Sequence, residues 1–296
     1  ALPICTIPTI TQESIKKMIF PKMSFEEQQK IADFLDKKTA QLDKVKSLLE
    51  EQIQKLKDYR ASLIYETVTK GLDKTVPMKD SGIDWIGEIP EEWDVSKIKY
   101  SLILMGSGST PDSSNPLNYD GEINWIQSGD LYGKSYIIET EKTITKYALH
   151  GNKSLKRYIA PFVVVAMYGA SVGNIALSQI DSYTNQACCV MKGDNSLNNK
   201  YLYYFLIANR HEMLMLAIGG TQPNISQQLI KNLNIIIPQF NDQQEIVDFL
   251  DKKCSEIDSV ISKKERQLNL IRKHRKSLIY EYVTGKKRVG GVENDN

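Results

Sequence analysis

Cysteine and histidine are scarce in this chain. The 296 residues include four cysteines and three histidines, with no Cys-x-x-Cys pair and no histidine spacing typical of a metal site. These features argue against a disulfide framework and a zinc ribbon, and they suit a reducing cytoplasm. We therefore predict no metal site; the residues concerned are Cys5, Cys188, Cys189, Cys254, His150, His211 and His274.

Long apolar runs and an excess of one charge sign are also absent. No run approaches the roughly 18 apolar residues needed to cross a bilayer, so we predict no membrane association and a cytoplasmic location. The first residue is Ala1 and no secretory leader follows, which fits a processed or trimmed piece of a protein. The formal net charge is only +2, so bulk charge does not by itself predict a nucleic-acid partner.

A long passage occurs twice. Residues 25–69 align without a gap with residues 240–284, 215 positions later, and both copies contain DFLDKK and SLIYE. Neither copy contains an internal proline or glycine, and apolar residues recur every seven positions, which predicts two long helices with an apolar seam. The predicted seam residues are Leu35, Leu42, Leu49, Leu56 and Leu63 in the first copy and Leu250, Ile257, Ile271 and Leu278 in the second.

The seam of each helix requires a partner helix, and we expect the two copies to pack as an antiparallel coiled-coil hairpin. About 42 helical residues would span roughly 63 Å. Lys264 interrupts the second seam. A polar residue at such a position often fixes register or partner choice, although it can also point its amine to solvent.

The segment between the copies has a different pattern. Residues 71–84 are polar and punctuated by glycine and proline, which predicts a linker. Short β-rich runs then follow as far as residue 238, and residues 201–218 have the apolar spacing of one helix. We therefore predict an α+β fold in which one globular α/β domain, residues 85–239, is flanked by the helices 25–70 and 240–285.

No catalytic constellation is apparent. GDLYGKS (129–135) has three residues between its first glycine and the Gly-Lys pair, whereas a P-loop requires four, so a polar turn explains it better. NPLNY (115–119) lacks the second proline and the adjacent aromatic of the adenine-methyltransferase motif. We therefore predict no catalytic residues and favour a recognition or scaffold protein, with an enzyme of unusual site as a minor alternative.

Four polar loops remain as candidates for binding. Glycine lets a backbone approach a ligand closely, Asn and Gln can contact adenine through two hydrogen bonds, and Lys or hydroxyl groups bind phosphates. Ordinary turns use the same residues, so the loops alone favour neither reading. The loops are GSGSTP (106–111), YGASVGN (168–174), YTNQ (183–186) and GGTQPNIS (219–226).

Several segments, in order, resemble one known family. The duplicated passage QQ-x-I-x-DFLDKK…SLIYE-x-VT resembles the conserved helical regions of type I restriction-modification specificity subunits. Other segments resemble the entry, interior and exit of the family's target recognition domains: residues 80–100, 161–177, 184–190, 201–206 and 219–238. The resemblance covers essentially all of residues 10–285.

This resemblance implies a non-catalytic subunit. Its target recognition domain would read one half of a bipartite site on double-stranded DNA, and its helices would act as a spacer and dock modification subunits. Those partners would carry S-adenosylmethionine and methylate adenine, so no cofactor is expected on this chain, and restriction subunits would join indirectly. An alternative is a coiled-coil assembly adaptor whose middle domain binds protein.

The chain departs from the family pattern in one respect. A complete subunit has two recognition domains, whereas here only residues 1–24 precede the first helix, and they resemble the end of such a domain. We therefore expect a half-subunit or truncated product that forms a homodimer or pairs with a second half-subunit. Residues 286–296 are expected to be a disordered polar tail.

The predicted DNA-binding residues come from the four polar loops and from GDLYGKS. Asn and Gln are expected to contact base edges, and Lys and hydroxyl groups to contact phosphates. Because the domain is nearly neutral, we expect the isolated chain to bind DNA weakly with a modest salt dependence. The predicted residues are Ser109, Thr110, Gln127, Lys134, Tyr168, Ser171, Asn185, Gln222 and Asn224.

Overall fold

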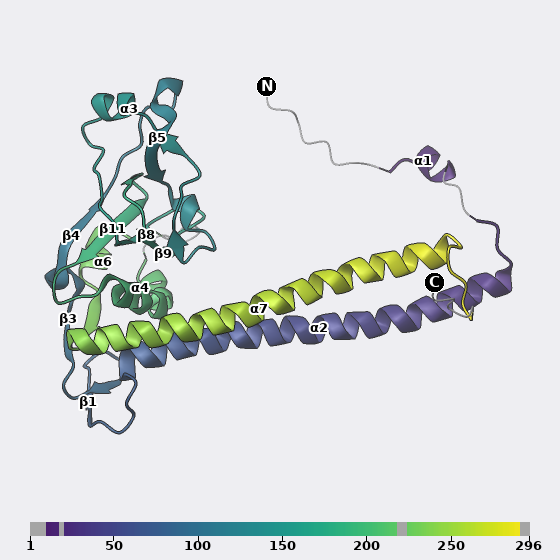
Figure 1. Ribbon diagram of the computed structural model, residues 1–296, viewed down its shortest axis with the longest axis horizontal. Helices are drawn as coiled ribbons and strands as arrows, with labels where there is room; N and C mark the ends of the chain where they lie inside the picture. The colour runs from purple at the N-terminus through teal and green to yellow at the C-terminus, as the bar shows by residue number, and fades with distance from the viewer. Residues whose placement is uncertain (1–9, 18–20, 218–223, 291–296) are drawn as a thin grey trace. The chain divides into compact units, whose positions relative to one another are not determined.

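The computed structural model describes residues 10–17, 21–217 and 224–290. The chain divides into two compact units: a helical unit (residues 1–57 and 258–296) and a sheet unit (residues 58–257). The two longest helices contribute to both units (Figure 1). The helices are α1 (Gln12–Lys16), α2 (Phe25–Lys70), α3 (Lys146–Gly151), α4 (Asn199–Ala208), α5 (Arg210–Met215), α6 (Gln227–Lys231) and α7 (Phe240–Val283), with 3-10 turns η1 (Ile98–Ser101), η2 (Pro116–Asn118) and η3 (Ser128–Leu131).

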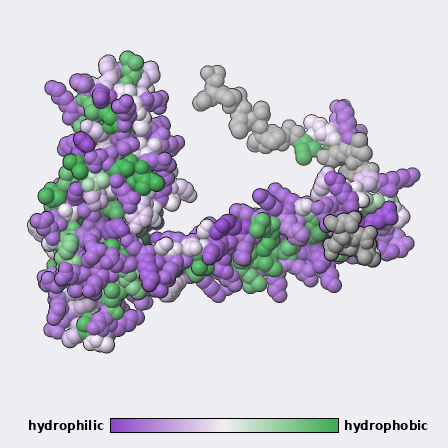
Figure 2. Space-filling model, viewed as in Figure 1, coloured by the Kyte–Doolittle hydropathy of each residue, from purple (hydrophilic) through white to green (hydrophobic). Residues whose placement is uncertain are grey.

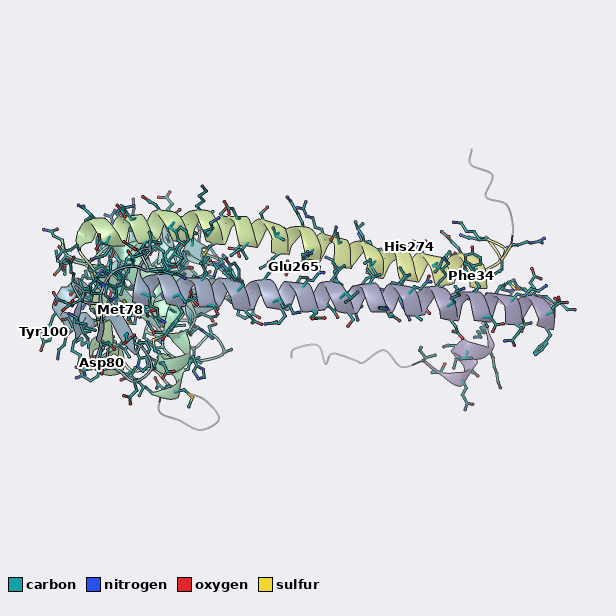
Figure 3. All side chains as sticks on the ribbon, turned by 90° about the horizontal axis from the view of Figure 1, so that it is seen from below. Phe34, Met78, Asp80, Tyr100, Glu265 and His274 are labelled. Atoms are coloured by element: carbon teal, nitrogen blue, oxygen red, sulfur yellow. The ribbon has the colours of Figure 1, made fainter. Side chains whose placement is uncertain are left out.

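Within the helical unit, α2 and α7 run antiparallel. Three cross-helix contacts pair early residues of α2 with late residues of α7: Phe34 with Tyr282 (ring centroids 4.7 Å apart), Asp43 with Arg275 (3.2 Å) and Glu50 with Arg272 (3.2 Å). The predicted coiled-coil hairpin is therefore present in this unit. Phe34 also lines a groove together with His274 of α7, and both are labelled in Figure 3.

The polar interruption of the seam has a partner in the opposite helix. Lys264 donates a hydrogen bond from Nζ to Oε1 of Gln52, 2.6 Å away. A polar contact of this kind across the seam favours one register of the two helices. The nine predicted seam residues are all buried or half-buried, from Leu250 at 0% exposed to half-buried positions such as Leu42 and Leu278.

The sheet unit is built around a five-stranded sheet of order β4-β11-β8-β9-β6. The first three pairings are antiparallel, and β9 pairs with β6 in parallel. Smaller sheets of order β10-β5-β7, β1-β2 and β12-β3 complete it. The strands are β1 (Met78–Asp80), β2 (Glu88–Pro90), β3 (Asp94–Lys97), β4 (Leu102–Ser107), β5 (Tyr119–Ile126), β6 (Tyr136–Ile137), β7 (Thr143–Ile144), β8 (Phe162–Ala166), β9 (Ile175–Ser178), β10 (Tyr183–Thr184), β11 (Cys188–Gly193) and β12 (Asn234–Ile237).

The central strand β8 is buried on both faces. Val163 and Val165 point into one hydrophobic core, while Phe162, Val164 and Ala166 point into another, following the two-residue period of a strand. The first core includes α4 and the ends of α2 and α7 that belong to this unit. Hydrophilic residues cover most of the visible surface, with smaller hydrophobic groups between them (Figure 2).

Two sequence expectations need correction. The single helix predicted over residues 201–218 is wrong, because α4 ends before Asn209 and α5 begins at Arg210. Asn209 donates from its side-chain Nδ2 to the carbonyl of Phe205 (2.7 Å), a local bond that competes with continuation of the helix. In addition, β1 lies within the expected linker 71–84 and pairs with β2.

Candidate nucleic-acid interface

Four of the predicted residues meet where β4, β5 and β10 end. The loop after β4 runs beside the end of β10, since Ser109 N–H donates to the carbonyl of Thr184 (3.0 Å). Asn185 N–H in turn donates to the carbonyl of Ile126 (2.9 Å), the last residue of β5. The structure thus brings together Ser109, Thr110, Gln127 and Asn185, which are separated by up to 76 positions in sequence.

A glycine allows this close crossing of two backbones. A Cβ placed on Gly108 would lie 1.7 Å from the carbonyl oxygen of Thr184, well inside contact distance. Any other residue at Gly108 would separate the loop from β10. The structure therefore explains why the second glycine of GSGSTP is needed.

Side chains outside the predicted set hold this loop in place. Asn152 donates from Nδ2 to the hydroxyl of Ser109 (3.0 Å), and Trp125 donates from Nε1 to the carbonyl of Ser109 (3.2 Å). Thr110 donates its hydroxyl proton to Oε1 of Gln186. Gln186 belongs to the quoted YTNQ motif, whereas nothing in the local sequence marks Asn152, because its partners lie more than 40 positions away.

A buried carboxylate fixes the backbone at Gln127. Asp130, 4% exposed, accepts from the N–H of Gln127 (2.8 Å) and from the N–H of Glu141 (3.0 Å). Beyond this turn, Lys134 is exposed and precedes β6, at the opposite edge of the five-stranded sheet from β4. Tyr132 is 76% exposed two residues before it, an aromatic that the sequence reasoning did not select.

The loop between β8 and β9 carries two more predicted residues. Its start lies beside the YTNQ loop and α6. Met167 donates its N–H to the carbonyl of Ala187 (2.7 Å), and the carbonyl of Met167 accepts from the N–H of Ile225 (2.8 Å). Burial, and to a smaller extent Cys188, raises the pKa of Tyr168, so its hydroxyl is a neutral donor. Ser171 is only 9% exposed, which weakens its prediction as a DNA contact.

The last two predicted residues come from GGTQPNIS. Asn224 is exposed and precedes Ile225, which bonds to the β8–β9 loop as described. Gln222 lies outside the described residues. The roles of all nine residues in DNA contact stay predictions.

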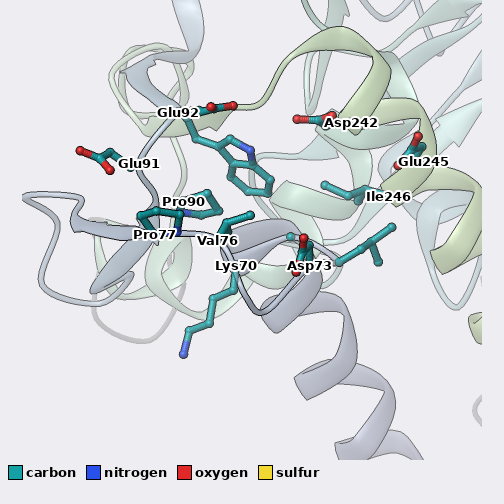
Figure 4. A pocket seen from close by; sticks show the side chains of 13 residues that line it. Lys70, Asp73, Val76, Pro77, Pro90, Glu91, Glu92, Asp242, Glu245 and Ile246 are labelled. Atoms are coloured by element: carbon teal, nitrogen blue, oxygen red, sulfur yellow. The ribbon is translucent and has the colours of Figure 1, made fainter.

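A pocket of about 380 Å³ at the α2–β1 connection has the wrong charge for phosphate. Asp73, Glu91, Asp242 and Glu245 line it together with Trp93 (Figure 4). Carboxylates repel an anionic backbone, so this pocket is no part of the candidate interface.

The start of α7 is attached to the sheet unit by two polar residues of the repeated passage. The buried side chain of Gln243 accepts from Asn198 N–H (2.9 Å) and donates to the carbonyls of Ser196 (2.8 Å) and Pro238 (2.9 Å). Asp251, in DFLDKK, accepts from the hydroxyl of Tyr204 (2.7 Å).

Asp251 has further partners, and apolar neighbours complete the surface. Lys200 contacts the Asp251 carboxylate through Nζ at 2.6 Å, and Tyr136 donates its hydroxyl at 3.3 Å. Ile246, Val247 and Leu250 lie in the same hydrophobic core. We call this surface the α7 platform; it comprises Gln243, Ile246, Val247, Leu250 and Asp251.

The equivalent surface on α2 has the same residue types but lines an open groove. Counting back 215 positions gives Gln28, Ile31, Ala32, Leu35 and Asp36, which we call the α2 platform. Gln28 donates from Nε2 to the carbonyl of Met23 (3.0 Å), repeating the bond from Gln243 to Pro238. The groove, about 480 Å³, is lined by this platform, by Met23 and by Val283.

Exposure separates the two platforms. Gln243 is 0% exposed, whereas Gln28 and Asp36 are exposed. Val68, near the end of α2, is 0% exposed and accepts at its carbonyl from Tyr201 (3.1 Å), whereas its repeat equivalent Val283 is 41% exposed. The repeat therefore presents the same residue types twice, and the sheet unit covers one copy.

Neither a metal cluster nor a membrane span is found in the described part of the chain. Among residues 10–17, 21–217 and 224–290, no group of three or more His, Cys, Asp or Glu side chains is arranged to hold a metal ion. None of the helices described there is both long and apolar enough to cross a bilayer.

The architecture combines an α+β domain with a pair of long repeated helices, and polar loops gather at the strand ends of the domain. Residues 90–270, more than half of the chain, match the family model described as the type I restriction modification DNA specificity domain. The chain belongs to this family.

Known relatives agree with this assignment. The type I restriction enzyme MjaIX specificity subunit of Methanocaldococcus jannaschii is 30% identical over 192 residues, covering 64% of this chain and 43% of that protein. The MjaVIII specificity subunit of the same organism is 25% identical over 292 residues, covering 96% of this chain and 65% of that protein. The aligned part of the chain thus spans less than two-thirds of the length of each relative.

A solved structure shares the fold. A chain from work on complex assembly and conformational transition of the type I R-M system superposes with a TM-score of 0.75 at 15% identity. The match covers 95% of this chain and 65% of that chain.

Proposed function

We propose that this chain supplies DNA sequence specificity to a type I restriction-modification complex, with the sheet unit reading one half of a bipartite site. The observation that supports this proposal is the convergence of separate polar loops at the ends of β4, β5 and β10 in a member of the DNA specificity family. An adaptor that binds only protein is not favoured, because it gives no reason for this convergence.

Base contacts are assigned to the amide side chains. Asn185 accepts from Ala187 N–H at Oδ1 (3.1 Å), which fixes the orientation of the amide and leaves a second lone pair on that oxygen. A fixed amide can accept from adenine N6 and donate to N7. Gln127 and Asn224 are proposed to act similarly, while Lys134 and the hydroxyls of Ser109 and Thr110 contact phosphates.

The chain acts without a reaction centre of its own in this proposal. Modification subunits bind S-adenosylmethionine and methylate adenine, restriction subunits join the complex indirectly, and this chain positions them on the target. The long helices act as the spacer and as the dock for the modification subunits. Such a complex works in the cytoplasm, where the host DNA is accessible.

Methylation mapping in cells tests the reading role. The chain is expressed with its modification subunits, and Asn185→Ala is compared with Asn195→Ala, which replaces an exposed asparagine in the turn after β11. We expect Asn185→Ala to relax or abolish one position of the methylated motif and Asn195→Ala to leave the motif unchanged. An unchanged motif in both variants would refute the assignment of Asn185.

We also propose that the α2 platform receives a second recognition domain, from the same polypeptide or from a second half-subunit. The repeat supports this, because the α7 platform already holds such a domain through the equivalent residues. One domain on each platform would give a bipartite site with a fixed spacing. A homodimer would then methylate a palindromic split motif.

Charge placed on the α2 platform tests the second docking event. Ala32→Glu puts a carboxylate on the exposed groove, while Lys252→Glu changes an exposed position of α7 outside both platforms. We expect Ala32→Glu to abolish methylation in cells without changing the melting temperature of the isolated chain, and Lys252→Glu to affect neither. Normal methylation by Ala32→Glu would contradict the docking proposal.

A further inference from the structure

One segment of the sheet unit is strongly basic although the chain is nearly neutral. Residues 142–157 contain five Lys or Arg and no Asp or Glu, against a net charge of +2 for the whole chain. All five are exposed: Lys142, Lys146, Lys153, Lys156 and Arg157. We call them the basic surface.

The basic surface is attached to a rigid part of the fold. Its first half consists of β7 and α3, and Thr145 accepts the N–H of Ala148 (3.3 Å) at the start of the helix. Ile144 and Ala148 are almost fully buried against Trp125. A Cβ on Gly121 of β5 would lie 2.5 Å from the carbonyl of Ile144, so the two strands are in close contact.

Most of the charge is not neutralised by neighbours. Arg157 pairs with Asp181 (2.8 Å); a hydrogen bond from Ala160 N–H and this guanidinium lower the pKa of the Asp181 carboxyl. Within the described residues, none of the four lysines has an acidic partner within 4.0 Å. Four solvated positive charges therefore remain available to an anion.

The basic surface is tied directly to the polar loop after β4, whose hydroxyls are proposed to contact phosphates. Asn152 lies between Lys146 and Lys153 in sequence, and its Nδ2 contacts both the hydroxyl of Ser109 (3.0 Å) and the carbonyl of Thr110 (3.4 Å). Asn152, which follows the last residue of α3, thus also positions the loop after β4. Figure 1 shows α3 and β5 together at one end of the sheet unit, with β1 at the other.

We propose that the basic surface holds the phosphate backbone of duplex DNA and sets the position of the domain, while the amide side chains of Gln127 and Asn185 contact the bases. Resting on the proposed function, this assigns the sequence-independent part of binding to residues 142–157. Phosphate contacts fix register without carrying sequence information, and each one releases counterions. The near-neutral net charge of the chain conceals this local surface.

The test compares two triple variants in the complex with modification subunits. Lys146→Gln, Lys153→Gln and Lys156→Gln remove three charges from the basic surface, and Lys70→Gln, Lys74→Gln and Lys79→Gln remove three at the β1 end. The affinity of each complex for a random-sequence duplex and for a duplex that contains its target sequence is measured over a range of KCl concentrations. Melting temperatures confirm that both variants are folded.

We expect the first variant to bind both duplexes more weakly by the same factor. Its slope of log affinity against log salt should fall in magnitude by about 0.9 for each phosphate that is no longer neutralised, or nearly three in total. The β1-end variant should keep the wild-type slope. Equal slopes in all three proteins, or a weakening confined to the target duplex, would overturn the inference, whereas failure of the wild-type complex to bind any duplex would instead refute the proposed function.

Discussion

Replacing Asp251 by alanine tests how the start of α7 is held in the sheet unit. The carboxylate accepts from Tyr204 and Tyr136 and pairs with Lys200, so three side chains from α4 and β6 depend on one residue. The change leaves the buried hydroxyl of Tyr204 without its acceptor. Lys200 can turn to solvent, because its side chain is 37% exposed.

The expected cost follows from these interactions. An unsatisfied buried hydroxyl costs about 1–3 kcal/mol, and removal of the half-exposed charge pair adds up to about 1 kcal/mol. We therefore expect the free energy of unfolding to fall by about 1–4 kcal/mol. With a urea m-value of about 2–3 kcal/mol/M, the midpoint should fall by roughly 1 M.

Tryptophan fluorescence provides the assay, and the repeat provides the control. All three tryptophans, Trp85, Trp93 and Trp125, lie in the sheet unit, so their fluorescence reports unfolding of that unit in urea. Asp36→Ala makes the same substitution at the exposed equivalent position and should change stability by less than about 0.5 kcal/mol. Equal midpoints for the two variants would refute the reasoning.

Three further predictions concern the sheet unit. Gly108→Ala should displace the loop from Thr184 and abolish DNA methylation in cells. Gly129→Ala is the control and should be tolerated, because the space around its Cβ is open. Normal methylation by both variants would contradict the close approach of the loop to Thr184. Burial raises the pKa of Tyr136 from its ordinary value of 10.0 to about 12. Its neutral form therefore stabilises the fold at and below pH 10, and this stability is lost as the pH rises towards 12. The urea midpoint of the wild-type chain should fall between pH 8 and about 11, and the fall should be smaller for Tyr136→Phe. Burial also raises the pKa of Cys189 to about 12, so a thiol reagent at neutral pH should label it only after unfolding, and rapid labelling of the native chain would be inconsistent with its burial.

The long helices were predictable because their signal is local and repeated. A period of seven over 45 residues without proline or glycine leaves few alternatives, and α2 begins at Phe25 as the pattern indicates. Local sequence also explains β8, which contains three consecutive valines. Local sequence failed at Asn209, where one side-chain bond to Phe205 divides an otherwise uniform apolar pattern.

The interface was predictable only in part. Loop composition selected Ser109 and Asn185, but their proximity depends on the pairing of β10 with β5, which links distant segments. Asn152 was missed because its function depends on partners more than 40 positions away. The net charge of +2 did not reveal the basic surface, because acidic residues elsewhere in the chain offset residues 142–157.

Exchange of the recognition domain measures the central claim most directly. Residues 85–239 are replaced by the aligned segment of another specificity subunit, and the methylated motif is mapped in cells that express the modification subunits. We predict that the half of the bipartite motif read by this domain changes to that of the donor, in both halves for a homodimer, while the spacing stays the same. An unchanged motif, in a complex that still methylates DNA, would contradict the assignment of sequence specificity to this domain.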